Sequence, residues 1–331
     1  MSVKQIHRIF EAGSVDGLLK LQQKENSIPE GYQVVFKRYF LSDTAQAREL
    51  PDEQGAVSVI CQPPLSGASA GVWLWMADCG SVHREDGLTV ACEGDDRHVW
   101  TSGLVSDAAG PELQMSEIFS RYEGILEAWG MTMADNCVRT WIFVDDIDHN
   151  YPGVVKGRRE RFETAGLTPE THYIASTGIE GRSPRQGCTV QMDAYAVFSP
   201  ALRQRYLYAP THMNPTYEYG VTFERGVRME CPDTSATFIS GTASIDNRGS
   251  VVHVGDVLSQ TFRMWENVEA LLSEAGNGWE DVRQILVYLR NASDFGIVAP
   301  LFARKFPDTP YIILKAPVCR PDWLIEMECL A

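Results

Sequence analysis

The chain has 331 residues, 44% of them apolar, and a formal net charge of −15 with an isoelectric point near 4.9. This length and apolar content exclude a disordered chain and are sufficient for two or three domains with hydrophobic cores. The acidic balance opposes contact with a phosphate backbone, so we expect no nucleic-acid partner.

The cysteines and histidines are scattered along the chain. None of the eight cysteines belongs to a C-x-x-C pair, and none of the seven histidines belongs to an H-x-H or H-E-x-x-H pattern, so no metal site is indicated. The first residues lack the apolar stretch of a secretory signal, and no window approaches the ~20 apolar residues of a membrane span. We therefore expect a cytoplasmic protein with reduced thiols and no membrane partner.

Residues from about 33 to 78 form the first group of predicted elements, whereas residues 1–30 give little signal. Strands are predicted at 33–40, 57–60 and 72–75, and the last two of these flank a turn that contains Pro and Gly. This group of strands corresponds to half of a larger unit, and two full copies of that unit follow it in the chain.

The middle and the end of the chain are two copies of that unit. The sequence WTSGL at 100–104 returns as FISGT at 238–242, and two later segments repeat at similar spacing. A domain-sized period indicates a duplicated module rather than a solenoid, and a ligand site is expected at the seam between copies. The first copy predicts helices at about 116–129 and 153–164, and the second of these carries the basic run 156–161.

After a linker rich in Pro and Tyr, the second copy predicts the order ββαβαββ. Asp256 is placed to cap the first helix, which ends at the glycines of 276–278. The predicted strands are 237–245, 251–254, 282–289, 311–315 and 323–330, and the second helix is 294–306. An apolar stripe on the first helix is expected to face the sheet; it consists of Leu258, Phe262, Trp265, Val268 and Leu272.

Four segments of the second copy form a recognisable set: residues 238–241, Gln260 followed by Asn267, the strand 282–288, and the terminal Ile-Glu-Met-Glu at 325–328. In these segments the chain resembles the RidA superfamily, the YjgF-like reactive intermediate deaminases once described as endoribonuclease L-PSP. Members of that superfamily form trimers with ligand clefts between adjacent units. Their deaminases pair an Arg with a Glu 15 residues later, and here Tyr311 stands 15 residues before Glu326.

A second resemblance covers most of the chain and is to chorismatases, which are tandem RidA-like enzymes that hydrolyse chorismate or eliminate pyruvate from it. The segments that carry it are 40–43, 57–65, Tyr151 with 157–158, 176–179, 219–225 and 318–326. It implies an α+β fold of tandem, chorismate-mutase-like ββαβαββ units, with helices packed on one face of mixed sheets and an internal pseudo-trimer. The units would be 1–98, an N-terminal segment with a half unit, 99–200 and 201–331. Asn150 stands where this resemblance would place an Arg.

Glu326 is the candidate catalytic residue. Side chains alternate along a strand, so Glu326 and Glu328 share one face of the last strand, opposite the apolar face that meets the helices. In the family that face lines the cleft between units, where a desolvated carboxyl would have a raised pKa and act as a general acid. Without the resemblance, two solvent-facing glutamates would explain the pattern. The first copy has Gln191 and Asp193 at these positions, so at most one seam is expected to be an acid–base site.

The other candidate site residues are substrate-binding ones. Guanidinium groups offer paired donors for a carboxylate, tyrosine hydroxyls can donate to a substrate oxygen, and small residues let backbone N–H groups approach a ligand. A solvated helix face, packing tyrosines and a plain turn are the structural alternatives. The candidates are Tyr151, Arg158, Ser176, Thr177, Gly178, Tyr219, Arg225, Cys319 as a wall residue, and Arg320.

Two functions of different classes follow from these residues. One is chorismatase-like hydrolysis or elimination on a small anionic metabolite, with Glu326 as the acid and without a metal or organic cofactor. The other is a non-catalytic metabolite-binding protein on the same scaffold; imine deamination is a further alternative. The chain is expected to be a monomeric pseudo-trimer or a homo-oligomer.

Overall fold

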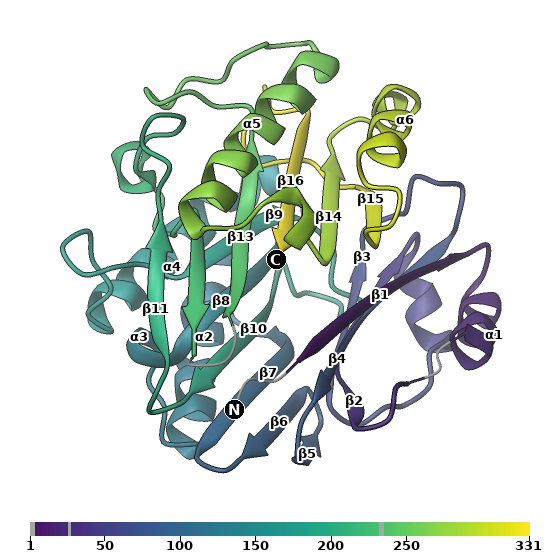
Figure 1. Cartoon of the computed structure of the whole chain (residues 1–331), viewed down its shortest axis with the longest axis vertical. Helices are drawn as coiled ribbons and strands as arrows, with labels where there is room; N and C mark the ends of the chain where they lie inside the picture. The colour runs from purple at the N-terminus through teal and green to yellow at the C-terminus, as the bar shows by residue number, and fades with distance from the viewer. Residues whose placement is uncertain (1–3, 26–27, 232–234) are drawn as a thin grey trace.

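The computed structural model describes residues 4–25, 28–231 and 235–331. Its strands form three sheets, and the helices lie on the outer side of the sheets (Figure 1). No helix in the described ranges is long and apolar enough to cross a membrane.

The first sheet has four strands in the order β1-β4-β2-β3. Helix α1 (Val15–Glu25) packs on it through Val15 and Leu18, and a short 3₁₀ helix, Thr44–Glu49, connects β2 to β3. The strands are β1 (Gln5–Ala12), β2 (Tyr32–Leu41), β3 (Ala56–Cys61) and β4 (Ala70–Asp78). Residues before 30, which gave little sequence signal, thus supply a strand and a helix to this sheet.

The second sheet has six strands in the order β5-β6-β7-β10-β8-β9. Its helices are α2 (Pro111–Ala128), the short α3 (Met133–Asn136) and α4 (Ile147–Thr164). The strands are β5 (Ser81–Glu85), β6 (Leu88–Glu93), β7 (Asp96–Val105), β8 (Cys137–Val144), β9 (Ala175–Glu180) and β10 (Val190–Phe198).

The third sheet repeats this arrangement in the order β11-β12-β13-β16-β14-β15. Helix α5 (Val257–Ala275) crosses β13 and β16, and α6 (Phe295–Lys305) connects β14 to β15 (Figure 1). The strands are β11 (Arg203–Leu207), β12 (Gly226–Glu230), β13 (Ser235–Ala243), β14 (Gln284–Leu289), β15 (Tyr311–Lys315) and β16 (Ile325–Leu330).

All three sheets share one strand pattern. Each contains a single parallel pair, β2 with β3, β8 with β9 and β14 with β15, and each is otherwise antiparallel. The expected α+β fold of tandem units with mixed sheets is confirmed. The division of the chain at residues 98 and 200 stays a proposal; β7 runs across residue 98, and the hairpin β5–β6 before it belongs to the second sheet.

Helix α5 has the predicted ends, and its predicted buried face is confirmed at Trp265, Val268 and Leu272 but not at the first turns. Asp256 caps it by accepting a hydrogen bond from Ser259 N, and Gly276 ends it in the left-handed region at φ 76°. The expected stripe is wrong at its beginning, because Leu258 is 41% and Phe262 47% exposed. Gln260, Thr261 and Met264 are buried at this end of the helix, and the first two are polar, which an apolar-periodicity argument does not anticipate.

The predicted strand at 251–254 is also wrong. Val251 makes only an isolated bridge to Ile245, and His253 has a positive φ of 59°. The antiparallel neighbours of β13 are β12 and β16 instead. The order ββαβαββ of the unit holds, with β12 as its first strand.

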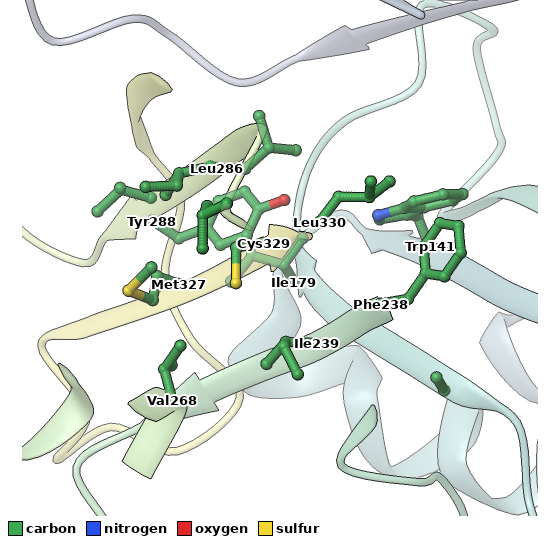
Figure 2. Packing of buried hydrophobic residues seen from close by; sticks show 14 of the residues in the cluster. Trp141, Ile179, Phe238, Ile239, Val268, Leu286, Tyr288, Met327, Cys329 and Leu330 are labelled. Atoms are coloured by element: carbon green, nitrogen blue, oxygen red, sulfur yellow. The ribbon is translucent and has the colours of Figure 1, made fainter. Parts of the chain in front are cut away.

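The main hydrophobic core lies between the sheets and extends beneath helices α5 and α6 of the third sheet. It joins residues from all three, and Figure 2 shows Trp141 of the second sheet beside Phe238 and Leu330 of the third. A second cluster fills the space between the second sheet and helices α2 and α4. All eight cysteines are unpaired.

Candidate functional site

A cavity of about 350 Å³ opens at the seam between the second and third sheets. Helix α4 and strand β9 form one side, and the bulged strand β13, the start of β16 and the segment 219–225 form the other. All ten predicted site residues line it; they are Tyr151, Arg158, Ser176, Thr177, Gly178, Tyr219, Arg225, Cys319, Arg320 and Glu326. That a ligand contacts them stays a prediction.

A β-bulge shapes the floor of the cavity. The pairing of β13 with β16 shifts between Ile239 and Thr242, so Ser240 and Gly241 lie in the irregular stretch. The equivalent Ser102 and Gly103 lie at a register shift between β7 and β10. Bulges of this kind redirect side chains next to binding sites, which explains why the Ser-Gly pair is repeated.

Two buried amides of α5 hold the walls of the cavity. Gln260 donates to the Asp322 carbonyl and accepts from Leu324 N, which anchors the segment before β16. Asn267 donates to the carbonyls of Ala243 and Ile245, both beyond the bulge. The Gln and Asn that carried the family resemblance therefore fix backbone on both sides of the site.

Glu326 lies on the wall of the cavity with a side chain that is almost fully buried. Gly241 faces it so closely that a Cβ atom there would overlap Glu326 Oε1. The carboxyl forms no hydrogen bond with the described residues, and burial, reinforced by the nearby Glu328, raises its pKa to about 8. A carboxyl with this pKa is a proton donor at neutral pH.

Two arginines place guanidinium groups at the cavity, and each has one nitrogen without a hydrogen-bond partner among the described residues. Arg158 donates from Nε to Thr222 Oγ1 at 3.1 Å, but its Nη2 has no partner among the described residues. Arg225 donates from Nη2 to the Asn214 carbonyl at 2.9 Å, and its Nε likewise lacks a described partner. A buried guanidinium with a free donor is costly unless an anion binds it, so both groups suit a carboxylate ligand.

Arg320 is more fully engaged. Its Nη1 donates to the Gly249 carbonyl, and its guanidinium carbon lies 4.5 Å from the ring centre of Tyr219 and 4.7 Å from that of Trp323. The Tyr219 ring also faces Arg225 at 5.5 Å. Arg320 thus contributes charge to the cavity while it packs against the rings.

Tyr151 and Cys319 form another part of the wall. A Cβ on Gly178 would lie 2.9 Å from the Tyr151 ring, so only glycine leaves room for this tyrosine. Burial raises the pKa of Tyr151 well above its ordinary value and that of Cys319 to about 12, so the thiol is protonated at neutral pH.

The hydroxyls of Ser176 and Thr177 are already engaged inside the protein. Ser176 Oγ accepts from Thr140 Oγ1. Thr177 Oγ1 accepts from Gly241 N at 2.8 Å and donates to Glu328. Their contribution to the cavity is therefore the shape of β9 rather than a free hydroxyl.

The contacts of Glu328 with Arg139 and Trp141, behind this wall, were not predicted from the sequence. Glu328 forms a buried ion pair with Arg139 of β8 and accepts from Trp141 Nε1, each at 2.7 Å. The alternation of side chains placed Glu328 beside Glu326, but nothing in the sequence connects it to an arginine 189 positions earlier. Asn150, the residue that departs from the chorismatase pattern, donates to the Asp145 carbonyl and does not line the cavity.

No metal centre is present in the described ranges: they contain no group of three or more His, Cys, Asp or Glu side chains that could hold an ion.

Comparisons with known proteins agree with this architecture. The sequence model of the family "Endoribonuclease L-PSP" matches residues 228–331. A 3-hydroxybenzoate synthase from Streptomyces hygroscopicus is 28% identical over 281 residues, 77% of this chain and 79% of that protein. The 3-aminoacrylate deaminase RutC of Acinetobacter baylyi is 31% identical over 96 residues, 28% of this chain and 76% of that protein. The crystal structure of a chorismatase superimposes with a TM-score of 0.75 at 18% identity, covering 100% of this chain and 99% of that one, which shows a shared fold.

Proposed function

Because the chain belongs to the RidA superfamily, in a tandem form that resembles chorismatases, we propose that it is an enzyme acting on a small anionic metabolite. The reaction is chorismatase-like hydrolysis or elimination, with Glu326 as the general acid. The observation that carries the proposal is one cavity lined by a carboxyl of raised pKa and by two guanidinium groups, in which the carboxyl forms no hydrogen bond and Arg158 Nη2 and Arg225 Nε have no partner among the described residues.

The chemistry requires a proton at carbon. In hydrolysis of an enol ether, the acid protonates the methylene carbon, water adds to the resulting oxocarbenium carbon, and the hemiketal collapses to an alcohol and pyruvate. In elimination, the same methylene carbon becomes the methyl group of pyruvate. Glu326 supplies that proton and later recovers one from the water or from the carbon that loses its hydrogen, so no electron acceptor is needed.

The arginines give the substrate its orientation. Arg158 comes from α4 and Arg225 from the segment before β12, so each of two elements that meet at the seam contributes one guanidinium group. A ligand with carboxylates at both ends can bind both groups and bring its enol ether to Glu326. Tyr151 and Tyr219 supply hydroxyl groups and apolar surface between them.

Imine deamination is less well supported, although the relative RutC is named a 3-aminoacrylate deaminase. The deaminase pattern would place an arginine at position 311, but Tyr311 lies on β15, does not line the cavity and packs against Phe302. The guanidinium groups of this cavity come from different elements.

The proposal is tested by mixing purified protein with chorismate and measuring pyruvate and the aromatic or dihydroxylated ring product. Wild type is expected to release pyruvate stoichiometrically with ring product, and Glu326→Gln to release none above background while chorismate still raises its melting temperature. Glu326→Gln keeps the shape of the side chain and removes the proton.

Two results would contradict the proposal. Pyruvate release by Glu326→Gln at the wild-type rate would remove Glu326 from the mechanism. A wild type that chorismate stabilises but that never consumes it would identify the non-catalytic binding protein instead.

A further inference from the structure

Glu328 has an environment opposite to that of Glu326, although it lies only two residues away on the same face of β16. Its carboxylate accepts hydrogen bonds from Arg139 Nη2 and Trp141 Nε1, at 2.7 Å each, and from Thr177 Oγ1. All three donors come from the second sheet. One of them is a guanidinium, so the Glu328 side chain is held in an ion pair across the seam.

Glu326 has no such partners. The charged and titratable groups that face it come from every element around the cavity. They are Glu328 on the same strand, Arg139 on β8, Tyr288 on β14, Tyr151 and Arg158 on α4, Cys319 and Arg320 before β16, and Tyr219 and Arg225 before β12. Glu328 is the group whose charge opposes ionisation of Glu326 most strongly, whereas Arg139 and Arg225 favour it.

Glu328 also acts on the wall against which Glu326 rests. Thr177 Oγ1 donates to Glu328 and accepts from Gly241 N, so the carboxylate orients the hydroxyl that holds the bulge. Gly241 in turn is in contact with the Glu326 carboxyl. The chain of contacts therefore runs from Arg139 through Glu328 and Thr177 to the backbone beneath the acid.

We propose that Glu328 is a positioning residue for Glu326: it fixes the bulge through Thr177, and its buried negative charge keeps the neighbouring carboxyl a proton donor at neutral pH. The assignment rests on the proposed function only for the role of that proton; the protonation state itself does not depend on the substrate.

The molecule supplies a matched control. Arg38 and Asp193 form the equivalent buried ion pair at the seam between the first and second sheets, at 2.8 Å and away from the cavity. Glu328→Gln and Asp193→Asn each remove one buried negative charge and leave one buried arginine without its partner. Only the first change is adjacent to Glu326.

The direct measurement is infrared titration of the protonated carboxyl band that is absent in Glu326→Gln. In Glu328→Gln its midpoint is expected to fall by about 1–2 pH units, because a unit charge at close range in a buried site is removed. Pyruvate release should then fall about tenfold at pH 8 and less than about threefold at pH 5. Asp193→Asn should leave the midpoint and the pH profile unchanged.

An unchanged midpoint in Glu328→Gln, or an equal shift in Asp193→Asn, overturns the proposal. If Glu328→Gln does not fold, the infrared titration of wild type still tests the proposal. Absence of the protonated Glu326 band at pH 7 would contradict it, because Glu326 would then not be a proton donor held by Glu328.

Thr177→Val tests the other contribution of Glu328, which is the fixing of the bulge through the Thr177 hydroxyl. In this variant kcat should fall about tenfold while KM and the pH profile stay the same, and an unchanged kcat contradicts the role of the hydroxyl. Absence of chorismate turnover in wild type contradicts the proposed function alone, since the infrared titration needs no substrate.

Discussion

Two seams of this molecule share a buried pair of an arginine and a carboxylate, and they differ at the residue two positions before the carboxylate. Between the first and second sheets, Arg38 pairs with Asp193, and Gln191 donates to Ser58 Oγ at 3.3 Å and to the Val59 carbonyl at 3.2 Å. Between the second and third sheets, Arg139 pairs with Glu328, and Glu326 occupies the place of Gln191 with no hydrogen bond to the facing strand.

The difference shows how one scaffold closes one seam and opens another. An amide has two N–H donors and can join the sheets through two groups of the opposite strand, whereas a protonated carboxyl has a single O–H donor, and Glu326 forms no hydrogen bond with the described residues of the facing strand. With Glu at that position, and with α4 and the 219–225 segment in place of the short 3₁₀ helix Thr44–Glu49, the second seam keeps a cavity. The ion pair is common to both seams, so it serves the architecture, and at the second seam it also lies next to the acid.

Replacing the side chain at each of the two equivalent positions, Glu326 and Gln191, tests this comparison most strongly. Glu326→Gln should lower kcat for pyruvate release by about 10²–10⁴-fold, the range for loss of a general acid. Gln191→Met removes two buried hydrogen bonds at the closed seam and should cost about 1–3 kcal/mol of unfolding free energy with kcat unchanged. Steady-state kinetics and chemical denaturation measure both. Equal losses of kcat in the two variants would mean that Glu326 acts only through the fold.

The pH dependence of stability should also differ between the seams, because Gln191 does not titrate. The pKa of Glu326 is raised from an ordinary value of 4.5 to about 8, so the folded state holds a proton that the unfolded state releases between these values. The contribution of Glu326 to the free energy of unfolding is fully present below pH 4.5 and is lost as pH rises through 8, by on the order of a few kcal/mol. Denaturation of wild type and Glu326→Gln should therefore diverge with rising pH, in favour of the variant. Parallel pH curves would show that Glu326 is ionised in the folded protein at neutral pH.

The guanidinium of Arg158 should matter for affinity, whereas its neighbours in the basic run should not. Arg158→Gln removes a buried cation with an unpartnered donor at the open seam and should raise KM about 100-fold. Lys156→Gln is the matched control, since Lys156 lies on the same helix but is exposed and paired with Glu112. A KM for Lys156→Gln that rises as much would indicate general attraction of an anion by the basic run instead of a specific contact.

The sequence predicted several parts of the fold from local patterns. The repeated Ser-Gly pairs, the Asp256 cap and the glycine stop of α5, and the alternation that set Glu326 on the same face as Glu328 could be read from neighbouring residues, whereas the family resemblance assigned that face to a cleft. The apolar stripe of α5 was wrong at Leu258 and Phe262, because the same helix buries the polar Gln260 to hold the cavity wall.

Contacts across the seams could not be predicted in this way. Arg139 lies within a strand whose eight residues are all buried. It contacts its partner Glu328 only because the second and third sheets pack against each other. A charged residue within an apolar strand is a signal that a partner exists, because an unpaired buried charge is too costly, but the chain does not state where the partner lies. The Arg38–Asp193 pair was hidden for the same reason.

The smallest predicted effect uses the two glycines of the repeated bulge and should give opposite results at the two seams. At Gly241, a Cβ would press on Glu326 Oε1 and lie 3.0 Å from Thr177 Cγ2; its φ is not in the left-handed region. Gly241→Ala should therefore displace the acid and lower kcat about tenfold, with little loss of stability. At Gly103, no atom lies within 4 Å of a Cβ, but φ is +64°, so Gly103→Ala should cost about 1 kcal/mol of stability with kcat unchanged. Kinetics and denaturation of both variants give four values. A loss of kcat alone in Gly241→Ala and a loss of stability alone in Gly103→Ala would agree with a bulge that is structural at one seam and supports Glu326 at the other. If the bulge had the same structural role at both seams, stability and kcat would fall together in both variants.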